Sequence, residues 1–251
     1  MFDLYIERTP AVFKCAVMLE ECGYDYNCTH ISVTRGDQHN PEFRAISPNG
    51  KIPVLVDNEP SDGGEPLIVF DSGAILMYLA ERSGRFLPTE TRQRAQTLQW
   101  LFWQASGLSP FSGQAIHFQR YAPEVTREYG QLRYEGEVKR LYGVLDTHLK
   151  DREFIAGDYS IADIGCHAWV EMYDRFEWDL RDWPDLNRWW KAIARRPQVM
   201  EAYKRVNDAR TAGPAGEDDF KKNMFGEAAA KLMPAPKIHV PQPKNLNDES
   251  E

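Results

Sequence analysis

The first residues of the chain alternate between apolar and polar side chains. This period of two over residues 2–6 predicts a half-buried strand. Apolar residues then recur with helical spacing over residues 11–22, and Gly23 is suited to cap the C-terminus of that helix. A second strand is predicted over residues 26–33. The order of strand, helix and strand favours a parallel pair joined by a right-handed crossover.

A second set of elements follows the polar segment 35–49. The apolar run at residues 51–57 contains an Ile-Pro pair and predicts a third strand. Turn residues at positions 62–64 lead to a fourth strand at residues 67–70. A helix opens at an Asp-Ser-Gly sequence and extends over residues 71–81. The third and fourth strands and this helix therefore complete a strand–helix–strand, strand–strand–helix order.

This order predicts an α/β, thioredoxin-like N-terminal domain over residues 1–82. Residues 83–90 form a short linker, and residues 91–210 have helical spacing almost throughout. Within that region Ser160 and Asp163 make a capping box, in which each side chain accepts a hydrogen bond from the backbone N–H of the other. The second domain is therefore predicted to be all-α.

Residues 211–251 form a C-terminal extension of different character. An amphipathic helix is predicted over residues 220–232. The remaining residues are rich in Pro, Lys and Asn and cannot bury a core of their own. The sequence leaves open whether this segment packs on the body of the protein or on a partner subunit.

Charge and composition exclude several classes of function. A formal net charge of -8 over 251 residues argues against nucleic acid or an anionic membrane as the main partner. No apolar run approaches the roughly 20 residues that span a bilayer, and the N-terminus lacks a basic signal region, so we expect a cytoplasmic protein. Four Cys and six His without ligand spacing argue against a metal site or a redox dithiol.

Four segments together carry a resemblance to a known family: residues 46–53, 71–81, 98–104 and 159–163. They resemble the glutathione S-transferase family, and within it the Nu-type, YfcG-like group of disulfide-bond oxidoreductases. The resemblance extends over about residues 1–205. It implies the cytosolic glutathione S-transferase fold, glutathione as substrate or co-substrate, and a homodimer.

The resemblance places glutathione against Ile52 and Pro53. A proline makes a cis peptide bond accessible at about 0.5–1 kcal/mol. The backbone N–H and C=O of Ile52 would then pair with the cysteinyl part of glutathione as an added strand would. The alternative is an ordinary proline at the edge of a strand.

Asp71 and Ser72 stand where a strand passes into a helix. The free N–H groups and partial positive charge of a helix N-terminus suit the γ-glutamyl carboxylate, and the Asp71 carboxylate suits the ammonium group. Both residues are also ordinary helix caps, and the two roles are compatible. The resemblance further assigns glutathione contacts to Gln38, Lys51 and Arg133, which without it would be read as solvated surface residues.

Thr9 is the catalytic candidate. A hydroxyl donor at the start of the first helix would favour the thiolate of glutathione, although Thr9 also suits a simple helix cap. In the related reductases a Thr-Pro-Asn turn adds an Asn side chain, but this chain has Ala11 at that position, which weakens the assignment. Cys15 lies on the apolar face of the helix, so we expect it to be structural.

An aromatic-rich stretch offers a site for a small hydrophobic or disulfide co-substrate: Trp100, Phe102, Trp103, Phe111, His117, Phe118 and Tyr121. We therefore expect an enzyme that directs the glutathione thiolate at an electrophile or a disulfide. A glutathione lyase acting on an aryl ether is the next alternative. A non-catalytic, glutathione-binding regulatory protein is the alternative from another class, because Ala11 replaces the Asn and the chain carries a long extension.

Overall fold

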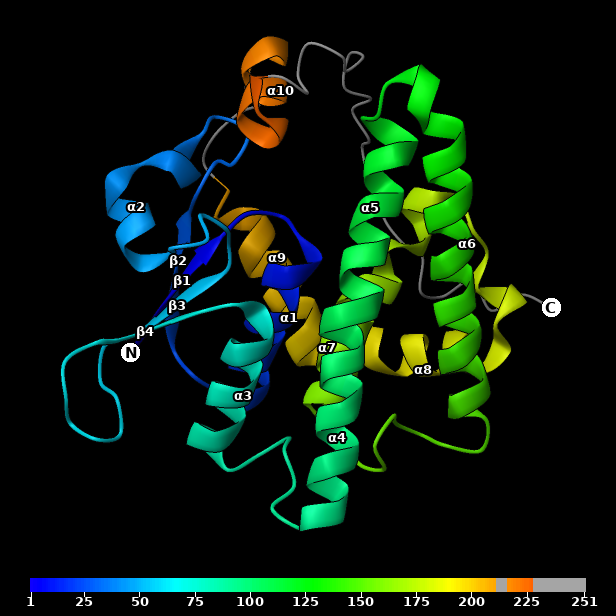
Figure 1. Ribbon diagram of the computed structural model, residues 1–251. Helices are drawn as coiled ribbons and strands as arrows, with labels where there is room; N and C mark the ends of the chain where they lie inside the picture. Colours follow the sequence, from blue (N-terminus) through cyan, green and yellow to red (C-terminus); the bar gives the residue numbers. More distant parts are fainter. Residues whose placement is uncertain (211–215, 228–251) are drawn as a thin grey trace.

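The N-terminal part of the chain folds around a four-stranded sheet (Figure 1). The structure is a computed structural model that describes residues 1–210 and 216–227. The strand order is β2-β1-β3-β4, with β1 and β2 parallel and the other two pairs antiparallel. The elements of this part are β1 (Phe2–Ile6), α1 (Pro10–Cys22), β2 (Tyr26–His30), α2 (Pro41–Ile46), β3 (Val54–Asp57), β4 (Leu67–Phe70) and α3 (Ser72–Ser83).

The alternation in β1 distributes its side chains between the two faces of the sheet. Phe2, Leu4 and Ile6 are buried in the main core with α1 and α3. Tyr5 points to the other face, where its ring lies 6.0 Å from that of Phe43 in α2. The period of two in the sequence therefore fixes which helices cover which face.

The second part is helical. A π-helical turn, Gln104–Leu108, joins the first two helices into one long rod that runs beside the third (Figure 1). Its helices are α4 (Thr91–Trp103), α5 (Ser109–Arg120), α6 (Glu124–Leu149), α7 (Ile161–Val170), α8 (Pro184–Ala194), α9 (Pro197–Asp208) and α10 (Glu217–Phe225). The rod approaches α6 closely because Gly130 leaves room for the ring of Phe118.

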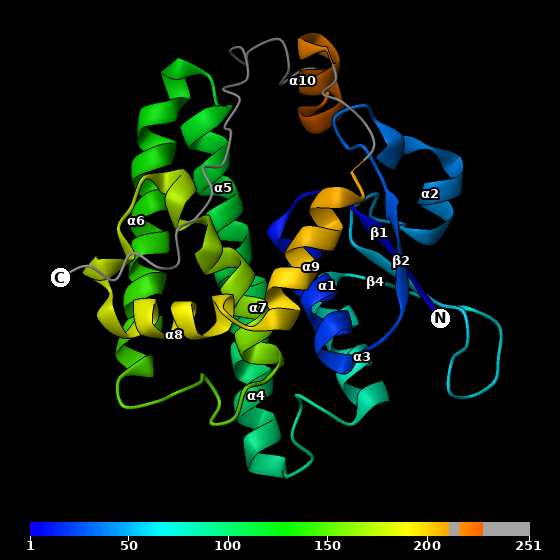
Figure 2. The same ribbon diagram turned by 180° about the vertical axis from the view of Figure 1, so that it is seen from behind.

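Helix α1 joins the two parts into one core. It packs on α3 within the sheet domain and on α7 and α9 of the helical part (Figure 2). A bidentate ion pair between Arg196 and Glu21, with the Nε to Oε1 distance at 2.6 Å, ties α1 to the segment before α9. Among the described residues, no helix is long and apolar enough to cross a membrane.

The predicted fold class is confirmed, and the bounds of several elements differ, among them β3, which begins at Val54 and not at residue 51. β2 ends at His30, earlier than expected, and the short helix α2 lies within the segment that was read only as polar. Of the predicted extension, residues 211–215 and 228–251 lie outside the described residues, whereas α10 begins at Glu217, earlier than the predicted helix. The domain limits at residues 82, 90 and 210 stay predictions.

The capping box of α7 contains a buried carboxylate that accepts four hydrogen bonds. The buried carboxylate of Asp163 accepts from the backbone N–H and hydroxyl of Ser160, at 3.0 and 3.1 Å. It also accepts from the N–H of Ile155 and the indole of Trp189, both at 2.9 Å. Burial raises the pKa of Asp163 to about 6, and these donors act in the opposite direction, favouring the carboxylate.

We expect Asp163→Ala to lower the free energy of unfolding by about 3 kcal/mol, because it leaves several buried donors without an acceptor. Urea unfolding followed by far-ultraviolet circular dichroism measures the change. Asp158→Ala, at an exposed position of the same loop, is the matched control. Equal stability of the two variants would show that the box does not hold α7.

Candidate functional site

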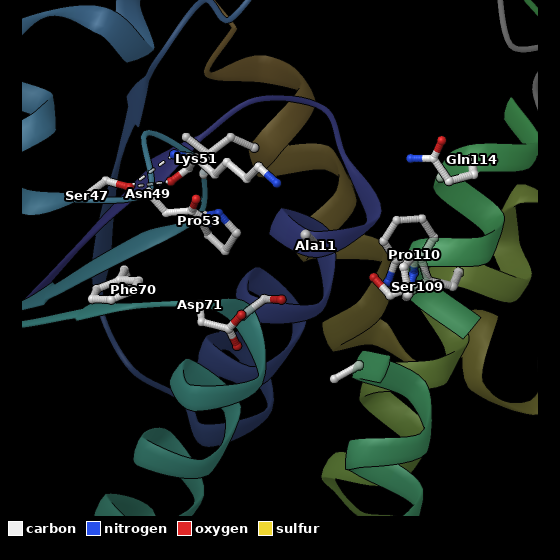
Figure 3. A pocket seen from close by; sticks show the side chains of 15 residues that line it. Ala11, Ser47, Asn49, Lys51, Pro53, Phe70, Asp71, Ser109, Pro110 and Gln114 are labelled. Atoms are coloured by element: carbon white, nitrogen blue, oxygen red, sulfur yellow. Dashed lines mark hydrogen bonds between the residues drawn. The ribbon is translucent and has the colours of Figure 1, made fainter. Parts of the chain in front are cut away.

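A cavity of about 450 Å³ opens between the sheet domain and the helical rod (Figure 3). Its two walls come from segments far apart in the sequence. The lining residues are Ala11, Ser47, Asn49, Lys51, Ile52, Pro53, Phe70, Asp71, Ser72, Ala105, Ser109, Pro110, Gly113, Gln114 and Trp169. Lys51, Pro53 and Asp71 thus lie across the opening from Pro110 and Gln114 (Figure 3).

A buried hydroxyl holds the loop before β3 in place. The Ser47 hydroxyl donates to the carbonyl of Lys51 at 2.8 Å and accepts from the N–H of the same residue at 3.1 Å. Gly50 has a φ of 62°, and a side chain there would collide with Arg44. These contacts present Lys51 and Ile52 to the cavity, and the Ile52–Pro53 peptide bond is cis.

Asp71 caps the N-terminus of α3, which begins at this wall. Its Oδ1 accepts from the N–H groups of Gly73 and Ala74 at 2.8 and 3.3 Å. Its φ of 71° is a left-handed conformation that is uncommon for a residue with a side chain. The capping role is therefore present, and both Asp71 and Ser72 also line the cavity. An anion placed here would meet the positive end of α3.

Thr9 caps α1 at the base of the same cleft. Its Oγ1 accepts from the N–H of Val12 at 3.4 Å. A hydroxyl that accepts this bond still has its own hydrogen to donate. Thr9 does not itself line the cavity, whereas Ala11 in the first turn of α1 does.

Gln38 does not line the cavity, and its side chain is hydrogen-bonded to α10. Its side-chain nitrogen donates to the carbonyl of Asn223 at 3.1 Å, and the Asn223 amide donates to the carbonyl of Thr34 at 3.0 Å. On the opposite side α10 contacts α5, where the ring of Phe225 lies 5.1 Å from that of His117. Helix α10 therefore bridges the two sides of the cleft near α2 and α5 (Figures 1 and 2).

Arg133 lies on α6, outside the lining of the cavity. Its side chain is 52% exposed, and its Nη1 stands 3.8 Å from the carboxylate of Glu137. The cavity thus brings together five of the eight predicted residues, Lys51, Ile52, Pro53, Asp71 and Ser72. Thr9, Gln38 and Arg133 remain outside its walls.

The helical wall differs from the aromatic stretch that the sequence indicated. None of those seven aromatic and histidine residues lines the cavity, and small or polar residues of α5 take their place. Trp100 packs on His148 with ring centroids 4.3 Å apart, so it serves the core. Trp169 lines the cavity but was not predicted, because in the sequence of a buried apolar helix it cannot be distinguished from a core residue. Its indole N–H is enclosed and has no hydrogen-bond partner among the described residues.

A buried lysine stands directly behind the cavity. Lys14 is 1% exposed, and its ammonium donates to Oε1 of Gln104 at 3.0 Å. Burial lowers the pKa of Lys14, and the nearby Cys15 and Asp71 oppose that shift. The neighbours of this pair, Asp71 and Ala105, line the cavity, so the Lys14 amine lies close behind its floor.

Cys15 has the structural role that its position on the helix predicted. It is fully buried, its Sγ lies 3.8 Å from the carbonyl of Ser72, and burial raises the pKa of its thiol to about 12. A thiol in this state is a poor nucleophile at neutral pH. Among residues 1–210 and 216–227, no His, Cys, Asp and Glu side chains gather in a group that could hold a metal.

Comparison with known proteins places the chain in a family. Residues 2–81 match the model of the glutathione S-transferase N-terminal domain, and residues 110–197 match that of the C-terminal domain. The chain is 48% identical over 203 residues to the disulfide-bond oxidoreductase YfcG of Escherichia coli, which covers 80% of this chain and 94% of YfcG. The chain belongs to the glutathione S-transferase family.

Solved structures of two Pseudomonas proteins are similar in sequence and fold. A glutathione transferase from Pseudomonas putida, with one glutathione disulfide bound per subunit, has 40% identity and a TM-score of 0.74. The aligned region covers 81% of this chain and 90% of the Pseudomonas putida chain. A family member from Pseudomonas fluorescens, with two glutathione bound, has 38% identity and a TM-score of 0.74 over 80% of this chain and 91% of its own.

The burial of Lys14 makes the free energy of unfolding depend on pH. Its pKa is lowered by folding from the ordinary value of 10.5, so the unfolded chain binds this proton more tightly. The free energy of unfolding that Lys14 contributes therefore rises with pH between its lowered pKa and 10.5 and is constant below that interval.

We expect the stability of the wild type relative to Lys14→Met to increase as the pH rises through that interval. Urea unfolding at several alkaline pH values measures the difference, with Lys150→Met, at an exposed position, as the control. A difference that is independent of pH would mean that the ammonium is not desolvated.

Proposed function

We propose that this protein binds glutathione in the cavity and uses its thiolate to reduce a disulfide or to attack an electrophile. The observation that carries the proposal is the convergence of Lys51, Ile52, Pro53, Asp71 and Ser72 on one cavity at the N-terminus of α3. These residues come from two separate segments of the sequence. Each supplies a group that matches part of the tripeptide.

Different residues are proposed to bind different parts of glutathione. The backbone of Ile52 takes the cysteinyl part, and the N-terminus of α3 with Ser72 takes the γ-glutamyl carboxylate. Asp71 takes the ammonium group, and the Lys51 ammonium takes a carboxylate. This arrangement directs the sulfur toward the first turn of α1, where Thr9 and the helix dipole favour the thiolate.

Disulfide reduction is the preferred reaction within this class. The four cysteines are free thiols, and burial raises the pKa of Cys15 and Cys166, so the sulfur chemistry belongs to glutathione. Similarity to a disulfide-bond oxidoreductase and to a transferase with bound glutathione disulfide supports this choice over an aryl-ether lyase. Free thiols also support the proposed cytoplasmic location.

Thr9→Ala is expected to lower kcat for the glutathione-dependent reduction of a disulfide by at least about tenfold, because the variant lacks the hydroxyl that stabilises the thiolate. Thr9→Ser keeps the hydroxyl and should retain most of the rate. Calorimetric titration should show similar glutathione affinity in both variants.

Unchanged turnover in Thr9→Ala would remove Thr9 from the mechanism. Tight glutathione binding by the wild type without turnover of disulfides, peroxides, halogenated aromatics or aryl ethers would instead favour the regulatory alternative.

We also propose a homodimer. Large apolar side chains are exposed on β4, α4 and the first half of α6: Leu67, Ile68, Phe70, Phe102, Val125, Tyr129 and Leu132. Their exposed fractions reach 91% for Val125, 79% for Tyr129 and 70% for Leu132, which is unfavourable in water unless a partner covers them. Arg133 shares this part of α6, so its proposed glutathione contact would have to be made across the dimer.

Light scattering should give twice the chain mass for the wild type and a lower mass for Leu132→Asp, which places a charge in the interface. Met200→Asp is the matched control, since Met200 is 52% exposed on α9, away from these elements. A wild-type monomer would contradict the proposal.

A further inference from the structure

Three arginines meet beside the turn that holds Thr9. Arg8 directly precedes it, Arg120 ends α5, and Arg175 lies in the 3₁₀ turn Glu171–Phe176 that continues α7. The guanidinium of Arg120 donates to the main-chain carbonyl of Arg175 at 3.1 Å. We refer to Arg8, Arg120 and Arg175 as the arginine cluster.

The charges in this cluster are close enough to affect one another. Burial lowers the pKa of Arg175, and the positive charge of Arg120 lowers it further. Arg8 acts in the same direction, whereas Asp174 and Tyr121 oppose it. All three arginines are half-buried, and the Nε of Arg8 is enclosed without a hydrogen-bond partner among the described residues.

The carboxylate nearest to Arg8 in the sequence is already engaged. Glu7 accepts from the backbone N–H of Arg8 at 2.8 Å and lies 3.3 Å from the ring of His30. It also lies 3.5 Å from the guanidinium of Arg210. Within the described residues, Asp174 is the carboxylate that offsets the charge of Arg175, whereas Arg8 and Arg120 both add to it, so an anion at the cluster would reduce the repulsion between the guanidinium groups.

Each arginine lies within six residues, along the sequence, of a residue that lines the cavity. Arg8 is next to the turn that leads to Ala11, and Gln114 stands in the same helix as Arg120, roughly 9 Å away along its axis. Trp169, whose indole N–H lacks a partner, lies in the helix that leads to Arg175. The cluster is therefore just beyond the cavity, where the N-terminal turn approaches the end of α5.

Helix α10 covers the same end of the cleft. The rings of Phe220 and Phe225 lie 5.7 and 5.4 Å from that of Tyr121, the residue that follows Arg120. Apolar side chains beside the cluster lower the local dielectric constant and so strengthen the interaction of the guanidinium groups with an anion.

We propose that the arginine cluster binds a carboxylate of the second substrate, so that the enzyme selects disulfides with anionic ends. The inference rests on the proposed function and names the substrate class of that site. Glutathione occupies the side of Lys51 and Asp71, and its sulfur lies at the Thr9 turn. The disulfide approaches from the side of α5, where planar guanidinium groups bind carboxylates with two hydrogen bonds.

The reaction balances with glutathione as the only reductant. The glutathione thiolate attacks one sulfur of the disulfide, the S–S bond breaks, and the departing thiolate takes a proton from water. The other half remains as a mixed disulfide with glutathione. A second glutathione thiolate attacks the glutathione sulfur of that mixed disulfide and releases the second thiol, leaving glutathione disulfide.

Three disulfides with equal spacers and different ends test the inference: 3,3′-dithiodipropionate, bis(2-hydroxyethyl) disulfide and cystamine. The measurement is kcat/KM for each with glutathione, divided by the uncatalysed rate constant for the same pair. The wild type should prefer the anionic over the neutral and the neutral over the cationic disulfide. Added salt should reduce the preference.

Arg120→Gln and Arg8→Gln should each lower the ratio of anionic to neutral turnover roughly tenfold, because each removes a charge-assisted hydrogen bond. Arg181→Gln is the matched control, because Arg181 is exposed and bonded to Asp179 elsewhere on the helical domain. It should keep the wild-type ratio.

Turnover without a ranking by charge would overturn the inference and leave the proposed function intact. An unchanged ratio in both arginine variants would also overturn it, since the preference would then arise elsewhere. No turnover of any disulfide by the wild type would overturn the proposed function, and the inference with it.

Discussion

Helix α1 is buried from both sides, and this constraint fixes where the cleft forms. One face packs on β1 and α3, and the other packs on α7 and α9. Because neither side is free, the N-terminus of α1 is held at the boundary of the two domains. Ala11 therefore lines the cleft, and Thr9 lies beside it as the N-cap of the helix. The apolar periodicity of residues 11–22 thus determines the site as well as the core.

Local patterns were sufficient for the elements of the sheet domain. The alternation in β1, the glycine cap at Gly23 and the cap at Asp71 are each decided within a few residues, and each was predicted. Helix α2 was missed because its short polar sequence has little apolar spacing. Its one deeply buried residue, Phe43, is anchored by Tyr5 from a distant strand, and a contact of that kind leaves no local signal.

The two walls of the site differ in how far the sequence determines them. Ile52, Asp71 and Ser72 belong to motifs with a local physical reason, so they could be named in advance, whereas Lys51 was assigned from the family resemblance alone. The opposite wall depends on how the helical rod docks on α1, which is a matter of long-range packing. Aromatic residues were expected there, but most of them pack in the core or against α6 and α10, and Phe102 is exposed on α4. The wall is left to small and polar residues such as Ser109 and Gln114.

The electrostatics of the cleft explain how the family chemistry can persist with Ala11 in the turn. A thiolate needs positive potential, and a neutral side-chain donor is only one source of it. Here the N-terminus of α1 and the guanidinium of Arg8 both lie at the turn. Full charges act over a longer range than a single hydrogen bond, and they act most strongly where burial removes water. Positive charge around the turn can therefore replace the missing amide, and the same charge would attract an anionic disulfide to the sulfur.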